Sequence, residues 1–353
     1  MKHLFLLALL LGCTTTPPPT PEPLPLIPPT GAPLLLSDWH LFAGKLADLQ
    51  ANAGVIPYEV NAVLYADGTL KDRALYVPPG GKIHWDPQNR WTFPQGTALI
   101  KTFYVLKDAR QPELGRRLLE TRLLALQKGL WIPQVYLWRD DQSEADRWIV
   151  GQTLTIAGID ADGHNLTFEY RVPNTGQCKN CHGQPKELLP LGPRTEQLNR
   201  NRQGVNQIAH LQELGLFDAE LPDPQTWQQL TDPLDETQPI DKRARAYLEA
   251  NCAHCHGKTG DGGSSGLWLD IAQTEPIALG VCRRPVAAAQ AGNGFTYDIV
   301  PGKPEESLLI HRVSSLDLKT KMPPLPTYQT DPFAVKLLSA WIAAMPATGC
   351  EGK

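Results

Sequence analysis

The chain has little net charge, few methionines and only a short N-terminal apolar run. Its 353 residues carry a formal net charge of -4, so we expect no basic surface for nucleic acid. The first twelve residues, MKHLFLLALLLG, are too short an apolar run to cross a bilayer as a helix. Three methionines leave few thioether groups for binding a metal, which makes the position of each one informative.

The N-terminus predicts an exported lipoprotein. A basic start followed by a short apolar run is typical of a signal peptide, here residues 1–12. The run ends in LLGC, which resembles the lipobox of bacterial lipoproteins and implies an acylated Cys13. An ordinary signal peptide cleaved elsewhere is the alternative. Thr14 follows Cys13, and by resemblance to Gram-negative lipoproteins this implies an outer-membrane anchor facing the periplasm or the cell surface.

Residues 13–36 after this cysteine are dense in proline. Such a segment favours a stiff, extended tether and not a packed element. It is expected to hold the folded part away from the membrane.

The motif Cys-x-x-Cys-His occurs twice, as CKNCH at 178–182 and CAHCH at 252–256. Two thiols with a histidine directly after the second are typical of covalent haem c attachment, with the histidine as proximal iron ligand. The cofactor prediction is therefore two haems c, held by Cys178, Cys181, His182, Cys252, Cys255 and His256. One zinc site built from all four cysteines is an alternative, as is a thioredoxin-type redox pair, although no βαβ pattern surrounds either motif.

Two further cysteines, Cys282 and Cys350, lie outside these motifs. An exported protein folds under oxidising conditions, so a disulfide between them is one possibility. Two buried free thiols are the other.

Met322 is the predicted distal ligand of the second haem. It precedes two prolines in KMPPLP, whose restricted backbone limits the conformations of the loop. Met345 lies inside an expected helix and is assigned to the core. The first haem has no methionine nearby, and its distal ligand is left open between water or an open site and one of four histidines, namely His40, His84, His164 and His210.

The expected fold class is multidomain, with a β-rich (α+β) domain at 37–182 that ends in the first motif. The segments 97–106, 131–138 and 152–172 alternate like strands, and 116–127 is ambiguous between helix and strand. A connector at 183–235 is expected to hold one helix at 196–215. Residues 236–353 are expected to form an all-α domain similar to class I cytochrome c, with helices starting near Asp241, Pro304 and Asp331.

Taken in order, several segments resemble an uncharacterised family of exported di-haem c-type cytochromes of Gram-negative bacteria. They are FPQGTALIKTFY (93–104), LLETRLLALQKGLW (118–131), PNTGQCKNCHG (173–183), RARAYLEANCAHCHG (243–257) and YDIVPGKPEESLLIHR (297–312). FPQGT and IKTF alone are also similar to mono-haem cytochromes that oxidise hydroxylamine and to β-sheet relatives of cytochrome c-prime. In the former, a lysine matched by Lys101 is cross-linked to the haem; a solvent-facing strand residue is the alternative for Lys101.

Electron transfer between redox protein partners is the leading functional expectation, with the lipid anchor as the contact to the membrane. The alternative is a haem enzyme whose open first haem takes peroxide, NO or hydroxylamine while the second haem relays electrons. Asp140, Asp141 and Glu144 would be acid–base groups of such an enzyme, or simply a solvated loop. A third hypothesis makes the β-rich domain a docking subunit for a dehydrogenase.

Overall fold

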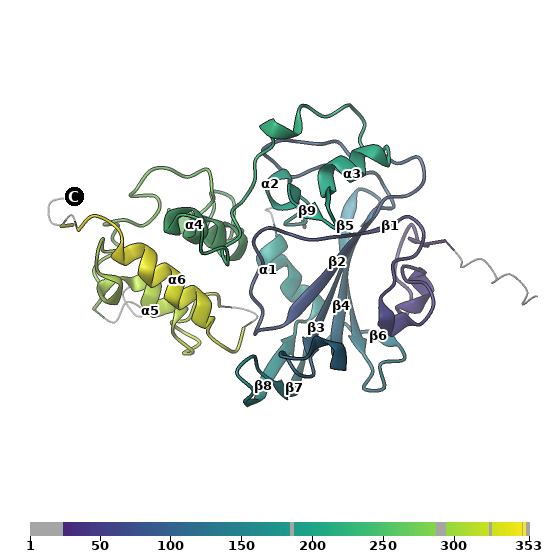
Figure 1. Ribbon diagram of the computed structural model, residues 1–353, viewed down its shortest axis with the longest axis horizontal. Helices are drawn as coiled ribbons and strands as arrows, with labels where there is room; N and C mark the ends of the chain where they lie inside the picture. Colours follow the sequence, from purple (N-terminus) through teal and green to yellow (C-terminus); the bar gives the residue numbers. More distant parts are fainter. Residues whose placement is uncertain (1–23, 184–186, 287–293, 325–326, 348, 351–353) are drawn as a thin grey trace, which may run out of the picture.

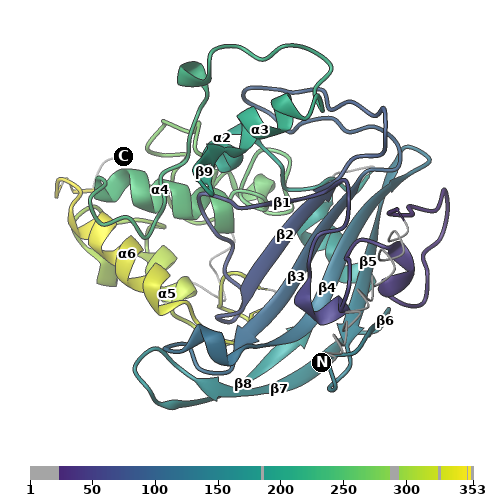
Figure 2. The same ribbon diagram turned by 45° about the vertical axis from the view of Figure 1, so that its right-hand side comes forward.

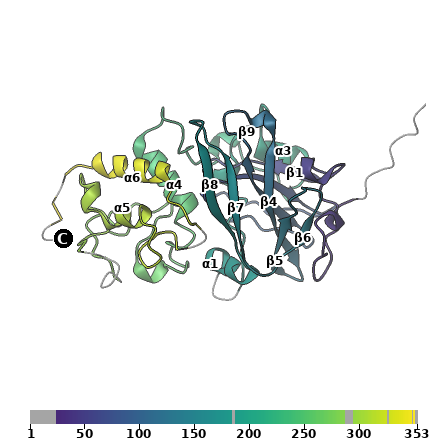
Figure 3. The same cartoon turned by 90° about the horizontal axis from the view of Figure 1, so that it is seen from below.

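A computed structural model describes residues 24–183, 187–286, 294–324, 327–347 and 349–350. These residues form two lobes, a sheet lobe (24–235) and a C-terminal lobe (236–350), which lie side by side in Figures 1 and 3. The predicted signal peptide, Cys13 and the first half of the predicted tether lie outside the described residues.

The sheet lobe is built on six antiparallel strands that follow one another in chain order. They are β1 Val55–Tyr58, β2 Leu70–Tyr76, β3 Ala98–Leu106, β4 Arg116–Gln127, β5 Leu130–Trp138 and β6 Ala145–Arg147. The strands predicted at 97–106 and 131–138 are confirmed as β3 and β5. The ambiguous segment is the longest strand, β4, because both faces of the sheet are covered and its apolar residues therefore do not alternate cleanly.

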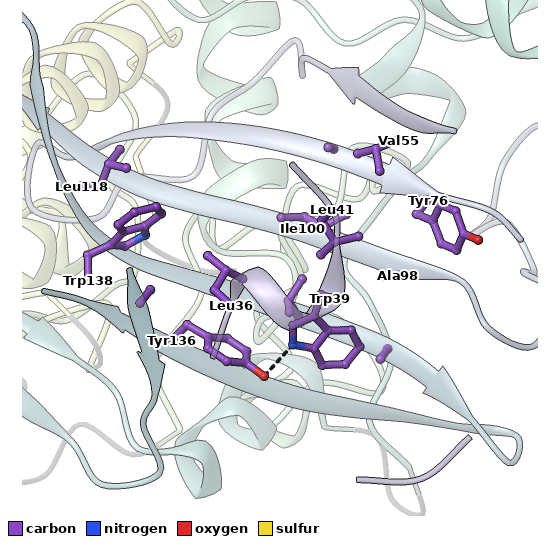
Figure 4. Packing of buried hydrophobic residues seen from close by; sticks show 14 residues of the cluster. Leu36, Trp39, Leu41, Val55, Tyr76, Ala98, Ile100, Leu118, Tyr136 and Trp138 are labelled. Atoms are coloured by element: carbon purple, nitrogen blue, oxygen red, sulfur yellow. Dashed lines mark hydrogen bonds between the residues drawn. The ribbon is translucent and has the colours of Figure 1, made fainter. Parts of the chain in front are cut away.

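One face of the sheet is covered by the N-terminal segment (Figure 4). Leu36 and Trp39 are fully buried there, and the Trp39 indole Nε1 donates a 2.6 Å hydrogen bond to the Tyr136 hydroxyl. That hydroxyl in turn donates to the carbonyl of Pro33 at 2.8 Å. The end of the predicted tether, from Ile27 onward, therefore packs on the sheet instead of extending freely.

The opposite face carries the connector and a hairpin (Figure 2). The hairpin, predicted at 152–172, is confirmed as β7 Gln152–Ile159 and β8 Asn165–Val172. The single helix predicted at 196–215 is wrong. The chain forms α2 Thr195–Leu198, a small hairpin of β9 Asn201–Arg202 and β10 Val205–Asn206, and α3 Gln207–Glu213. Gly204, with φ of 85°, makes the hairpin turn, and the Asn206 side chain caps α3.

The C-terminal lobe contains α4 Ile240–Asn251, α5 Leu308–Val313 and α6 Pro332–Ala343. The expected fold class, which paired a β-rich domain with an all-α cytochrome c-like domain, is therefore wrong. Between α4 and α5 the described residues form loops rich in glycine and proline, which do not sustain a helix. Asp241 does not cap α4 but accepts a 2.9 Å hydrogen bond from the Trp341 indole of α6.

Short 3₁₀ helices complete the described structure. They are Ser37–Trp39, Leu46–Asp48, Pro112–Leu114, Thr175–Cys178, Pro224–Thr226, Gly263–Ser265 and Pro304–Glu306, and a single α-helical turn, α1 Lys179–His182, follows the fourth of them. Within the described ranges, no helix is both long and apolar enough to cross a membrane.

Direct hydrogen bonds join the two lobes. The backbone N–H of Tyr65 donates to the Asn251 side chain at 2.7 Å, and the Tyr65 hydroxyl donates to the carbonyl of Thr330 at 3.0 Å. Arg194 of the connector pairs with Glu249 of α4 at 2.6 Å. The seam between the lobes is thus an ordered interface, and both Cys-x-x-Cys-His segments lie on it.

Candidate functional site

The six described cysteines comprise one disulfide pair and four free thiols. Cys282 and Cys350 form a disulfide, which settles the choice left open by the sequence. The four cysteines of the two Cys-x-x-Cys-His motifs are free thiols. The thiols that covalent haem attachment would use therefore do not take part in the Cys282–Cys350 disulfide.

The first motif is held by a well-capped turn. The Asn174 side chain accepts a 2.9 Å hydrogen bond from the backbone N–H of Gln177, whose own side chain accepts one of 3.0 Å from the backbone of Asn174. This capping box starts the 3₁₀ helix that leads into α1 and His182. The capping box therefore fixes the start of the turn that carries the first motif.

The second motif follows directly on α4. Cys252 is the C-cap of that helix, and the backbone N–H of His256 donates to the Cys252 carbonyl at 2.8 Å. A rigid helix thus fixes the first cysteine, while a tight turn brings the histidine beside it.

The two motifs meet across the seam. The Cys255 thiol lies 3.5 Å from the Asn180 carbonyl oxygen, and the ligand atoms of Cys181, His254 and Cys255 all lie within 4.8 Å of one another. A hydrogen bond from the Cys255 thiol, and a second from His254, stabilise the Cys181 thiolate. Both interactions lower the pKa of Cys181. Only two of the four motif cysteines share this cluster, so the geometry does not match a single four-cysteine zinc site.

A cavity of about 600 Å³ adjoins the second motif. Cys252, Cys255 and His256 line it together with Met322, the predicted distal ligand. Much of the remaining wall is apolar and includes Leu267, Leu269, Ile299, Leu308 and Leu309. Its volume falls in the ~300–1,000 Å³ range of sites for sizeable ligands. The residues present therefore fit a large apolar group bound by two thiols and a histidine.

His256 is itself suited to binding a metal. Burial lowers its pKa, which favours the neutral imidazole that metal binding requires. The backbone of Leu267 hydrogen-bonds the ring, which offsets part of this lowering and orients the imidazole.

A smaller cavity, of about 230 Å³, adjoins the first motif and is lined by Cys178, Cys181 and His182. Nδ1 of His182 lies 2.9 Å from the Leu189 carbonyl oxygen, so its N–H donates there and Nε2 is left free. This is the arrangement found behind metal-binding histidines, because the second hydrogen bond orients the ring. Burial and then the charge of Lys101 lower the pKa of His182 to about 4, so the imidazole is neutral.

Basic residues of the sheet line this smaller cavity. Arg73, Lys101 and Arg122 are direct cross-strand partners on β2, β3 and β4, and all three are in the wall. Burial and then the charge of Arg122 lower the pKa of Lys101 to about 7. The expected alternative of a solvent-facing Lys101 is therefore wrong, since its side chain faces the cavity.

Glu120 is the buried counter-charge. Its carboxylate accepts hydrogen bonds from Arg122 Nε at 2.9 Å and Nη2 at 2.5 Å, and from the Tyr170 hydroxyl at 2.6 Å. Glu120 has no exposed surface. The carboxylate thus fixes Arg122 in place but leaves Lys101 and Arg73 without an ion-pair partner among the described residues.

The two cavities share a wall. Leu64, Asn180 and Cys181 line both of them. Groups bound at the two motifs would therefore lie on either side of a shared stretch of wall.

Several predicted candidates lie elsewhere. None of the four histidines considered for the first haem, His40, His84, His164 and His210, lines either motif cavity. The side chain of Asp140 is 95% exposed, and the Glu144 carboxylate is used to bind Ser37 at 2.6 Å. These carboxylates are parts of a surface loop, which leaves the solvated-loop interpretation. Met345 packs in the core of the C-terminal lobe, as expected.

Sequence reasoning missed Arg73, Arg122 and Asn180. The strand residues have a weak signal in the sequence, because each is a basic residue one or two positions from apolar residues that face the core, as in KDRALY and ETRLL. Asn180 occupies a variable position of the first motif and gives no signal of its own.

Comparisons with protein-family models, curated proteins and solved structures found no match, so the family resemblances expected from the sequence stay predictions.

Proposed function

We propose that the protein is a di-haem c-type cytochrome that transfers electrons between redox partner proteins. The observation that carries the proposal is the shared wall: two cavities, each with its own Cys-x-x-Cys-His segment, have Leu64, Asn180 and Cys181 in common. Electron exchange falls off steeply with distance, so two redox groups in adjoining cavities with this shared wall would be well placed to exchange electrons.

Each motif offers a complete attachment set, the first beside the smaller cavity of about 230 Å³ and the second beside the larger one of about 600 Å³. Cys178 and Cys181 would form the thioethers of the first haem and Cys252 and Cys255 those of the second. His182 is neutral, with its Nδ1–H donating to a backbone carbonyl, and leaves Nε2 for iron. Reversible one-electron oxidation and reduction is the chemistry that the iron supplies when bound.

The second cavity also offers a distal ligand. Met322 lines the same cavity as His256, and its backbone N–H is fixed by a 2.9 Å hydrogen bond to the carbonyl of Arg312. Apolar walls exclude water, and a thioether ligand favours the reduced iron, so this cavity suits a haem of raised potential. Both features support electron transfer rather than chemistry on a substrate at this site.

The test is a haem count on the purified full-length protein. A pyridine haemochrome assay should give two haems c per chain, and one for Cys178→Ser/Cys181→Ser. The matched control, Cys282→Ser/Cys350→Ser, removes the same number of cysteines outside the motifs and should keep two. Stoichiometric zinc in place of iron, or no covalent haem, would refute the proposal.

We also propose that the chain is held at the outer membrane through an acylated Cys13, facing the periplasm or the cell surface. The support is the sequence LLGC at the end of the apolar run. Metabolic labelling with a fatty-acid analogue should be lost in Cys13→Ser and kept in Cys282→Ser. Labelling that persists in Cys13→Ser would disprove the anchor.

A further inference from the structure

Three cations in a row on one face of the sheet call for an explanation. Arg73 pairs directly with Lys101, and Lys101 pairs directly with Arg122, on three adjacent strands. Like charges at directly opposed positions destabilise a sheet. This row therefore works against the stability of the fold, which favours a functional role.

The row is tightly grouped and short of negative charge. The Phe103 ring lies beneath several of these cations, with Lys101 Nζ at 5.2 Å and Arg122 Cζ at 4.3 Å from its centroid. Nζ of Lys71, which lies two residues before Arg73 on β2, is 5.7 Å from the centroid of the same ring. Within the described ranges the only ion pair made by these four cations is that of Arg122 with Glu120. The cluster thus has unpaired positive charge directed at a cavity, a setting that attracts an anion.

The row lies in the cavity of the first motif. Arg73, Lys101 and Arg122 line the same space as Cys178, Cys181 and His182. The basic side chains therefore share one cavity with the residues that would hold the iron.

No methionine lines this cavity, and His182 is its only histidine among the described residues. A haem bound at His182 would therefore lack the usual second ligand, in contrast to the second cavity with Met322. The space beside the iron would instead be lined by guanidinium and ammonium groups.

We propose that Arg73, Lys101 and Arg122 form a binding site for a small inorganic anion, of the size of nitrite or azide, beside the first haem. This inference rests on the proposed attachment of a haem at Cys178, Cys181 and His182. It gives the first haem a ligand-binding role in addition to its electron exchange with the second haem. The propionate groups of the haem are also anionic and could bind the same cations. The test must therefore distinguish a free anion from the propionates.

The experiment is a titration of the oxidised full-length protein with sodium azide and, separately, sodium nitrite at constant ionic strength. Absorption spectroscopy should show one haem per chain changing from high spin to low spin with azide. Lys101→Met and Arg73→Gln should each weaken azide binding at least tenfold. Lys258→Met is the matched control, because Lys258 is also a lysine over an aromatic ring, that of Trp268, but lies in the C-terminal lobe; it should bind azide like the unaltered protein.

Carbon monoxide binding to the reduced protein distinguishes a loss of positive charge from a change in the shape of the cavity, because carbon monoxide is neutral. A neutral ligand should keep its affinity in Lys101→Met and Arg73→Gln within about twofold, because these changes remove charge without filling the cavity.

Three results would overturn the inference. Unchanged azide affinity in both variants, together with a lowered potential of the first haem, would assign the row to the propionates. A low-spin first haem that becomes high spin in Lys101→Met would make the lysine amine an iron ligand instead. Two low-spin haems that ignore azide in every variant would also refute it. In all three cases the haemochrome count of two stands, whereas a count below two would refute the proposed function itself.

Discussion

Replacing Glu120 with glutamine tests whether this buried carboxylate offsets the destabilising repulsion between Arg73, Lys101 and Arg122. Glu120 is fully buried and accepts three hydrogen bonds, two from Arg122 and one from Tyr170. Glutamine keeps the volume of the side chain, but it carries no charge and turns an N–H₂ group toward one of these donors. Arg122 then has no counter-charge while Lys101 stays beside it.

The cost follows from the burial of the pair. Breaking a buried ion pair by removing one partner costs about 3–5 kcal/mol. Arg122 keeps 23% of its side chain exposed, and water there compensates part of the lost charge. The expected loss in the free energy of unfolding for Glu120→Gln is therefore at the lower end, about 3 kcal/mol.

Urea unfolding of the full-length protein, followed by circular dichroism and extrapolated to zero urea, measures this loss. Asp140→Asn is the matched control, because Asp140 pairs with Arg117 at 3.1 Å but is 95% exposed; it should cost less than about 1 kcal/mol. The double variant Glu120→Gln/Arg122→Met removes the orphaned charge and should recover at least half of the loss. Equal destabilisation by Glu120→Gln and Asp140→Asn would refute the view that the buried carboxylate holds the row together.

Three further predictions concern the second cavity, the disulfide and pH. Met322→His should keep a low-spin second haem but lower its midpoint potential in a redox titration, since imidazole favours oxidised iron more than a thioether does; a midpoint unchanged in both Met322→His and Met322→Ala would exclude Met322 as ligand, and Met345→Leu is the control. Cys282→Ala/Cys350→Ala should lower the free energy of unfolding by about 4 kcal/mol, because the disulfide closes a loop between cysteines separated by 68 positions; a loss below about 1 kcal/mol would contradict this. Burial lowers the pKa of Lys71 to about 6 and that of Lys101 to about 7, so from pH ~7 to the ordinary lysine value of ~10.4 the unfolded chain binds more protons and stability should rise with pH. Lys101→Met should reduce that rise in urea unfolding at fixed low salt, and a slope equal to that of the unaltered protein would disprove the shift for Lys101.

Local patterns predicted the strands of the sheet and the helices α4 and α6, but not the loops that make up much of the C-terminal lobe. Alternating residues at 97–106 and 152–172 have their partners nearby in the chain, so the strands could be predicted from local sequence. The helix expected at 196–215 failed because a glycine with positive φ and an asparagine cap outweigh the apolar spacing there. The all-α prediction failed because it extended three expected helices and a motif to a whole domain, while the glycine-rich chain between α4 and α5 stays in loops.

The grouping of thiols and imidazole within each Cys-x-x-Cys-His motif follows from sequence alone, and covalent haem attachment stays a prediction. Two cysteines and a histidine within five residues must lie close together in space, because neighbours in the chain cannot move far apart. This holds for both 178–182 and 252–256. Met322 lines the same cavity as His256, and its role as an iron ligand stays a prediction from the prolines that restrict its loop. Whether Cys282 would meet Cys350 was undecided, because sequence spacing says nothing about which distant thiols come close.

Tertiary structure alone decided what surrounds the motifs. Arg73, Lys101 and Arg122 lie far apart in the chain and become neighbours only through the register of three strands. The shared wall of the two cavities likewise requires the sheet lobe and the C-terminal lobe to pack together, which places Cys181 beside Cys255. Strand register and lobe packing are set by the sum of many weak apolar contacts across the whole fold, and no short stretch of sequence contains that sum.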